Sequence, residues 1–505
     1  MYEKLLGRSN VGQVPARSGG VRFRAAGAAL VIAIAVGACG SATTTPTATG
    51  RPTFTPSPAA RPTDSPSPGP SASPTAPATA SPTAWPSPLM TMAPEGFPVA
   101  LGKAKLLAPA PDSGVLAGTE INDFGFDLLR RLSSTGNLCA SPTSIALALA
   151  MVRPGANGVT ATEMDKVLHS FGSTAQAAET VALLKALGDA TYYDDSDFDS
   201  ADPSATPDHT GKQPVVELDV SNAVFSQNGM NLEPAYLNAL SSGFGAGVGL
   251  VDYRNNAEAA RQTINKWADL RTKGRVPNIL SPGDIDSSTR IALANAIYFK
   301  AVWMDQFEPS ATKSLPFTRA VGTKVSVPTM VRESEYQYAA GTGYRAVEIP
   351  FLSSATMMIV VPDNMSTFVN GLSAAKLATI SKQLSNYIVD LTLPKFSADS
   401  RVDLATVLKA MGMTTSFDSL SADLSGITPD EHLYLDKVIH QANIDVDENG
   451  TTAAAVTIVG GRGGAGEPPP RAQLHIDKPF LYFVREDTTG VVLFMGRIDD
   501  PSVKS

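Results

Sequence analysis

Cysteine is scarce in this chain of 505 residues, which contains only Cys39 and Cys139. A disulfide-rich scaffold needs several cysteine pairs, and a zinc module needs clustered cysteines and histidines. The five histidines form no HExxH pattern and have no metal-ligand spacing with either cysteine. The sequence therefore excludes a disulfide-rich scaffold and predicts no metal site.

An excess of positive charge is also missing. The chain has 40 Lys and Arg against 48 Asp and Glu, a formal net charge of −8. A general nucleic-acid-binding protein needs a basic face. We therefore expect no nucleic-acid partner.

Long hydrophobic runs are absent, and the clearest short one is Ala25–Val36. A membrane span needs about 20 apolar residues, so this run is short for one. Basic residues precede it and small residues follow, which is typical of a secretory signal. The ending Val36-Gly37-Ala38-Cys39 resembles a bacterial lipobox, which implies that Cys39 is lipidated. A simple cleaved signal, or an uncleaved anchor with Cys39 incidental, is the alternative.

We therefore expect residues 1–38 to be a lipoprotein signal peptide. The chain would be exported and held by lipid at the outer face of the cell membrane. Residues 39–95 are rich in Pro, Ser, Thr and Ala and bury too little to fold, so they predict a disordered stalk or spacer. Residues 96–505 have the composition of an ordinary globular domain.

Hydrophobic patterns in this domain predict both helices and strands. Apolar residues at helical spacing predict helices at 119–132, 143–152, 160–171 and 404–413. Apolar runs rich in β-formers predict strands at 215–225, 289–303, 357–362, 387–396, 479–486 and 490–498. Helices come early and strands late, so we expect an α+β fold with mainly antiparallel sheets.

Enzyme motifs give no support for catalysis. The chain has no GxSxG elbow and no Walker A loop. A GxGxxG stretch at 461–466 is followed by three prolines, which prevent the helix that a dinucleotide site requires. The acidic segment 192–213 reads as a solvated loop, with a calcium site as the weaker alternative. We expect no enzyme and no cofactor.

The tail of the chain carries a family resemblance. Residues 443–457 read NIDVDENGTTAAAVT, a strand-like segment followed by glycine and small residues. This segment resembles the proximal hinge of the serpins, a family of serine protease inhibitors. Other blocks match the family in the same order, among them GNLCASPTSIALALA, INKWADLRTKGRVPNIL, TRIALANAIYFKAVW and DKPFLYFVREDTTGVVLFMGRI.

The resemblance implies a serpin fold: three β-sheets with surrounding helices and an exposed reactive-centre loop, here at about 448–472. It also implies suicide inhibition. A serine protease, or sometimes a cysteine protease, cuts the loop and forms an acyl-enzyme, and the cut loop inserts into the largest sheet. The expected partner is thus a covalently bound protease, and we expect the chain to be a monomer.

Site residues carry over by position within these blocks. The resemblance implies a hinge of Glu448, Gly450, Thr451, Ala453, Ala454 and Ala455. It implies a shutter beneath the opening sheet, formed by Ser141, Ser144, Asn295 and His440. Trp303 matches the breach, where the loop first enters the sheet.

The reactive bond is assigned by counting from the hinge. The family spacing places it at Gly464-Ala465, which suits a protease with a small pocket. The loop is longer than usual, so Arg462-Gly463 competes and would suit a trypsin-like enzyme. Arg471-Ala472 is a third possibility, but it follows three prolines and lies late.

Two other functions stay open at this point. One is a non-inhibitory surface lipoprotein with the serpin fold, acting as a protease substrate or a binding protein. The other is a structural or adhesion lipoprotein that has kept the fold. Cys139 falls within the first helical block and is expected to be a small buried apolar residue.

Overall fold

The computed structural model describes residues 98–109, 114–132, 135–189, 216–451 and 468–503. All of them belong to the second of two compact units, Ser81–Ser505. The expected signal, stalk and lipidation site, the acidic segment and the alanines of the hinge lie outside the described residues. So do the bonds Gly464-Ala465 and Arg462-Gly463.

Seven of the described strands form a first sheet. In pairing order they are β1 (Val99–Ala100), β4 (Val248–Val251), β3 (Val216–Gln227), β5 (Ile291–Val302), β12 (Ile439–Val446) and β11 (Phe396–Asp403), and β13 (Gly450–Thr451) also pairs with β5. β5 and β12 are parallel, as are β3 and β4, and the other pairs are antiparallel.

Nine strands form a second sheet. They are β14 (Arg471–His475), β10 (Ser385–Pro394), β7 (Lys324–Gly341), β8 (Tyr344–Pro350), β9 (Ala355–Pro362), β15 (Phe480–Glu486), β16 (Val492–Ile498) and β2 (Leu138–Ala140), with β6 (Lys313–Thr318) beside β7. We expected three sheets. The hydrogen-bonded ladders give two because the long strand β7 pairs with β6 at its start and with β8 at its end, joining two smaller sheets.

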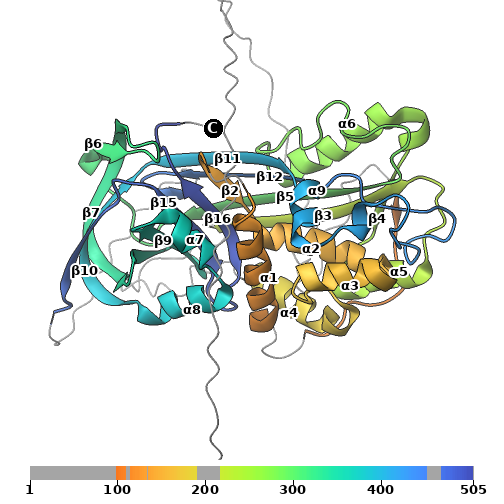
Figure 1. Cartoon of the computed structure of the whole chain (residues 1–505), viewed down its shortest axis with the longest axis horizontal. Helices are drawn as coiled ribbons and strands as arrows, with labels where there is room; N and C mark the ends of the chain where they lie inside the picture. Colours follow the sequence, from red (N-terminus) through yellow and green to blue (C-terminus); the bar gives the residue numbers. More distant parts are fainter. Residues whose placement is uncertain (1–97, 110–113, 133–134, 190–215, 452–467, 504–505) are drawn as a thin grey trace, which may run out of the picture. The chain divides into compact units, whose positions relative to one another are not determined.

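Helices cover both faces of the first sheet. The described helices are α1 (Gly114–Leu129), α2 (Pro142–Val152), α3 (Gly158–Val167), α4 (Ala177–Asp189), α5 (Pro234–Phe244), α6 (Tyr253–Arg271), α7 (Met365–Asn370), α8 (Ala374–Gln383) and α9 (Ala405–Met411). α6 lies on one face of the sheet, and α1, α2 and α4 lie on the other (Figure 1). The predicted α+β fold is confirmed.

Local chemistry explains where several helices begin and end. Ser141 caps α2, since its hydroxyl accepts a hydrogen bond from the Ser144 N–H. Gly412 ends α9 with a φ of 113°. The helix predicted to reach residue 171 stops at Val167 instead, and the chain then turns through His169 and Ser170, both with positive φ.

The core has two parts. The larger joins α1 and α2 to the second sheet and to one face of the first. The smaller lies between α6 and the first sheet, where Trp267 packs edge-on against Phe225. Cys139 is buried as expected, but it lies in strand β2 and not in a helical block. Burial raises the pKa of its thiol to about 12, so it stays protonated.

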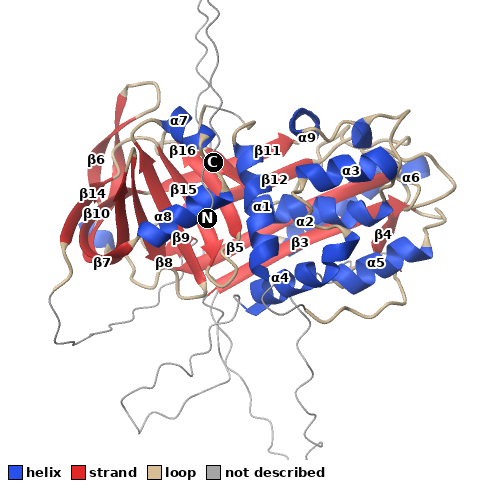
Figure 2. Ribbon diagram, turned by 60° about the horizontal axis from the view of Figure 1, so that its bottom comes forward, coloured by secondary structure: helices blue, strands red, loops and turns tan. Residues whose placement is uncertain are grey.

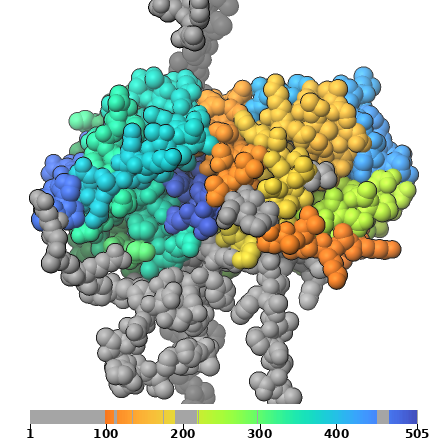
Figure 3. Space-filling view, turned by 90° about the horizontal axis from the view of Figure 1, so that it is seen from below, coloured from red at the N-terminus to blue at the C-terminus, as the bar shows by residue number. Residues whose placement is uncertain are grey.

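The first described residues run along α5. The Lys103 and Ala104 N–H groups donate to the Asn238 side chain, and the Leu107 N–H donates to the Ser242 carbonyl. In Figure 3 these residues form the orange edge beside light-green residues. Within the described part of the chain, no helix has the length and apolar character that crossing a membrane requires.

Candidate functional site

The candidate site is an incomplete junction in the first sheet. Residues 439–441 of β12 pair with 294–296 of β5, and the pairing stops there. On its other side β12 pairs with β11 along its whole length. The slot, as we define it, is the unpaired stretch between residues 297–300 of β5 and 442–446 of β12. Figure 2 shows the strands of this sheet running side by side beneath the helices.

The hinge enters the far end of this slot. Gly450 and Thr451 form β13, which pairs antiparallel with Val302 and Ala301 of β5. Thr451 is buried, and its Oγ1 accepts a hydrogen bond of 2.9 Å from the Ala301 N–H. Gly450 and Thr451 of the hinge thus already occupy positions of an additional strand.

Gly450 has a conformation that requires glycine. Its φ is 137°, which L-residues with side chains rarely adopt. A Cβ at this position would lie 2.1 Å from the Ala301 carbonyl oxygen. The close approach of the hinge to β5 therefore depends on the missing side chain.

Glu448, the first residue of the expected hinge, anchors the chain through its carboxylate. Its carboxylate accepts hydrogen bonds of 2.7 Å from the Lys395 Nζ and of 2.7 Å from the Thr312 Oγ1. Burial opposes ionisation of this carboxyl group, but the bonds from Lys395 and Thr312 outweigh it and lower the pKa. Glu448 thus ties the hinge to Lys395, which connects β10 to β11, and to Thr312, directly before β6.

Trp303 closes the end of the slot. Its ring is fully buried and stacks on Phe351 with 4.4 Å between ring centroids. The indole Nε1 donates to the Asp447 carbonyl at 2.9 Å, and the Trp303 N–H donates to the Asn449 carbonyl at 2.9 Å. The tryptophan therefore holds the backbone on both sides of Glu448.

The four residues expected in the shutter meet beneath the paired end of β5 and β12. The Ser141 N–H donates to His440 Nε2 at 3.1 Å, and His440 Nδ1 lies 2.8 Å from Asn295 Oδ1. Asn295 Nδ2 donates to Ser144 Oγ and to Asn222 Oδ1, each at 2.6 Å. One network thus joins α2, β3, β5 and β12.

The network determines the protonation of His440. Because Nε2 accepts the Ser141 N–H, the ring proton is on Nδ1, which donates to Asn295. The side chain is 1% exposed, and burial lowers its pKa from 6.5 to about 3. His440 is therefore a neutral hydrogen-bonding group that links α2 to β5 and β12.

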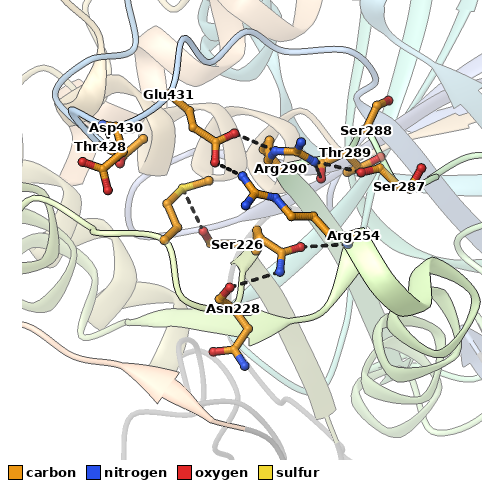
Figure 4. Close-up of polar contacts among 12 residues, drawn as sticks. Ser226, Asn228, Arg254, Ser287, Ser288, Thr289, Arg290, Thr428, Asp430 and Glu431 are labelled. Carbon is orange, nitrogen blue, oxygen red and sulfur yellow. Dashed lines mark hydrogen bonds and ion pairs between the residues drawn. The ribbon is translucent and has the colours of Figure 1, made fainter.

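Charged residues join the chain segments where β3 ends and β5 begins. Glu431, in the loop that leads toward β12, lies between two arginines (Figure 4). Its carboxylate contacts Arg254 at the start of α6 and lies 2.6 Å from the Nε of Arg290, directly before β5. Arg290 also donates to the Ser287 and Thr289 carbonyls.

Of the three bonds considered for cleavage, only Arg471-Ala472 lies in the described residues. Arg471 begins β14, which pairs with β10, and its Nη1 lies 3.0 Å from Glu333 Oε1. A protease needs its substrate as a free extended segment. A bond held in the second sheet is therefore a poor substrate.

The structure brings together the shutter, the breach tryptophan and the described hinge residues around one slot. Sequence reasoning missed four of their partners: Asn222, Lys395, Thr312 and Phe351. Each is a common residue type with no motif around it, and its role depends on a contact across the fold. The described residues contain no cluster of three or more His, Cys, Asp or Glu that could hold a metal ion.

The described part of the first sheet thus combines a slot beside β5, a hinge that pairs with β5 at the end of this slot, and a buried histidine network. The family model described as Serpin (serine protease inhibitor) matches residues 119–501. This match covers most of the chain, and the chain belongs to the serpin family.

Curated relatives agree with this assignment. The chain is 33% identical over 392 residues to the leukocyte elastase inhibitor of Xenopus laevis, covering 75% of this chain and 97% of that protein. It is 31% identical over 399 residues to neuroserpin of Homo sapiens, covering 75% and 91% of the two chains.

Solved structures show the same fold. The native state of the thermophilic serpin tengpin matches with a TM-score of 0.67 at 22% identity, covering 80% of this chain and 99% of that one. Thyroxine-binding globulin in complex with thyroxine matches with a TM-score of 0.62 at 27% identity, covering 76% and 99%.

Proposed function

We propose that this chain inhibits a serine protease as a suicide substrate. The protease cleaves the segment between β13 and β14, and its serine oxygen forms an ester with the carbonyl carbon at the cut. The peptide nitrogen leaves as a new amino terminus. The freed segment then enters the slot as a strand, carrying the esterified protease with it before water hydrolyses the ester.

The observation that supports this proposal is the pairing of the hinge residues Gly450 and Thr451 with β5. β13 runs antiparallel to β5, and β5 is parallel to β12. A strand that continues from Thr451 is therefore antiparallel to both neighbours and can pair with each. The residues that follow are Thr452 and three alanines, whose small side chains suit insertion into a packed sheet.

We further propose that the inhibitor is exported and anchored through lipid on Cys39. The support is the sequence of the first 39 residues, with a basic start, a short apolar run and a lipobox-like ending. The segment 39–95 would then act as a stalk between the anchor and the inhibitory domain. Both roles rest on sequence alone.

Covalent trapping tests the inhibitory function. The full chain is incubated with a trypsin-like, an elastase-like and a subtilisin-like protease and separated on denaturing gels. We expect a band at the summed mass with at least one of them. Mass spectrometry of the released C-terminal peptide identifies the bond: a peptide starting at Ala465 indicates cleavage after Gly464, and one starting at Gly463 indicates cleavage after Arg462.

Two variants make this test specific. Thr451→Arg places a charge at a buried hinge position, so the loop should be cleaved at the same bond without trapping. Thr379→Arg changes an exposed residue of α8 and should trap like the unmodified chain. Loop cleavage by every protease with no covalent band, in the unmodified chain as in Thr451→Arg, would reject inhibition and favour a protease substrate or binding protein.

A further inference from the structure

A cavity of about 740 Å³ lies among five segments of the chain. These are the chain where α1 ends, helix α7, the turn between β6 and β7, the start of β15 and the residues after β16. The described hinge, shutter and breach residues do not line it. Small-molecule sites have volumes of roughly 300–1,000 Å³. The cavity is therefore large enough for a ligand and is separate from the site proposed for protease inhibition.

The protein's own contacts fix the wall formed by the β6–β7 turn and the residues after β16. The Ala320 N–H donates to the Asp499 carbonyl at 3.2 Å. The Arg319 Nε lies 2.6 Å from Asp500 Oδ2. The N–H groups of both aspartates donate to Asn137 Oδ1, each at 3.0 Å. A ligand would therefore lose little affinity to ordering this wall.

Apolar side chains line both the depth and the mouth of the cavity. Leu129 and Leu132 line it and are buried. Val321 and Val503 line it as well, and they are 81% and 54% exposed. A ligand with an apolar body would cover these side chains and remove apolar surface from water, which favours binding.

Most charges in the cavity are already paired within the protein. The basic residues that line it are Arg130, Arg319, Lys478 and Arg497, and the acidic ones are Asp363, Asp499 and Asp500. Each of the three arginines contacts an aspartate, and the pairs are Arg130–Asp127, Arg319–Asp500 and Arg497–Asp499. The charges that remain are those of Lys478 and Asp363.

Lys478 is the basic group most open to a ligand anion. Its Nζ lies 3.9 Å from Asp363 Oδ1, beyond hydrogen-bonding distance, and the Asp363 side chain is 72% exposed. An ion pair with so exposed a carboxylate contributes little. The Lys478 side chain is itself only 33% exposed. A carboxylate bound inside the cavity can therefore accept a charge-assisted hydrogen bond from Lys478 in less aqueous surroundings.

We propose that the cavity binds a small amphiphilic carboxylate of the fatty-acid type. Its alkyl chain packs against the leucines and valines of the lining, and its carboxylate accepts a hydrogen bond from the Lys478 ammonium. Apolar burial supplies affinity, and the lysine selects an anion over a neutral or cationic amphiphile. The proposal is independent of the proposed inhibitory function, because no residue of the slot takes part.

Calorimetric titration of the full chain with sodium decanoate, below its micelle concentration, tests this proposal. We expect saturable binding that is tighter than the binding of decanol or of decylammonium. Lys478→Met removes the charge but keeps an apolar side chain. It should weaken decanoate binding roughly ten-fold, as expected for a hydrogen bond to a charged group, and leave decanol binding unchanged.

A second variant and two controls separate the cavity from the rest of the chain. Val321→Asp adds a carboxylate at the mouth and should weaken the binding of decanoate and decanol alike, and the exposure of Val321 should leave the fold intact. The matched controls lie outside the cavity: Lys266→Met changes an exposed residue of α6, and Leu420→Asp changes a leucine that is 89% exposed. Neither control should alter decanoate binding.

Labelling with a diazirine derivative of decanoate, followed by mass spectrometry, locates the ligand. We expect label in residues 318–321 and 362–370. Label confined to other residues, no saturable binding, equal binding of the three amphiphiles, or equal loss in Lys478→Met and Lys266→Met would overturn the proposal. So would self-association of the full chain that Val321→Asp abolishes and decanoate does not affect, which would assign the cavity to a second copy.

Discussion

At the scale of single residues, His440 shows how one neutral side chain links the two strands beside the slot. It accepts the Ser141 N–H and donates to Asn295, so its ring can hold both bonds only in the neutral form. A protonated ring would lose the first bond and place a charge in a site closed to water. The paired end of β5 and β12 should therefore be sensitive to acid.

We expect the free energy of unfolding to fall as the pH is lowered from about 6.5. The unfolded chain takes up a proton at His440 near its ordinary pKa of 6.5, whereas the folded chain does so only near its lowered pKa of about 3. Between these values the unfolded state binds more protons, so stability decreases by up to about 1.4 kcal/mol per pH unit. Urea unfolding between pH 7 and 4 measures this.

His440→Gln is the control for this prediction. Glutamine offers a donor and an acceptor but does not titrate in this range. The variant should be less stable than the unmodified chain at pH 7, and its stability should depend less on pH between 6.5 and 4. Equal pH slopes for the two proteins would show that other groups cause the acid sensitivity.

At the scale of elements, the first described segment protects an edge of the first sheet. β1 pairs with β4, which would otherwise be an exposed edge strand. Only two residues form this pairing, and the rest of the segment is held by α5 through Asn238, Ser241 and Ser242. Helix α5 therefore positions the strand that covers β4.

Asn238→Ala should loosen this segment without disturbing the slot. The change removes the side-chain oxygen that accepts hydrogen bonds from two backbone N–H groups. It should lower the free energy of unfolding by only about 1 kcal/mol, because these N–H groups can donate to water instead. We expect faster proteolysis within residues 98–109, measured by limited digestion and mass spectrometry. Asn370→Ala, at the end of α7, is the control, and equal digestion of both variants would contradict the role of Asn238.

At the scale of the whole molecule, the proposed mechanism requires a native state that is less stable than its cleaved form. An inserted strand would pair on both sides, and each backbone hydrogen bond contributes about 0.5–1.5 kcal/mol. In the proposed mechanism these bonds form only after cleavage has freed one end of the segment that follows Thr451. Cleavage should therefore stabilise this protein, whereas it destabilises most others.

We expect the loop-cleaved chain to melt several degrees above the uncleaved chain, since in a domain of about 400 residues each kcal/mol of added stability raises Tm by about 1 °C. Calorimetry on samples cut by a protease that is not trapped measures this. Cleavage of the Thr451→Arg variant should raise Tm much less, because burying a charged side chain at this hinge position would oppose strand insertion. Equal melting temperatures before and after cleavage in the unmodified chain would contradict strand insertion.

Much of the fold could be predicted from local patterns and family resemblance. The strands at 289–303 and 479–486 and the helix at 143–152 appear close to their expected bounds, and the serpin fold is confirmed. The shutter residues were named by resemblance, but their partner Asn222 was not. Lys395 and Thr312 were missed as well. Both contact Glu448 only in the folded chain, and neither belongs to a local sequence motif.

The sequence by itself determined the hydrophobic periodicities, the glycine at position 450 and the small residues after it, because these are properties of neighbouring residues. Tertiary structure alone decided that pairing between β5 and β12 stops at residue 441 and that Thr451 pairs with Ala301. These features depend on residues far apart in the chain, such as His440 and Asn295, which are 145 positions apart. Such contacts form only when the whole sheet closes, so no local pattern contains them.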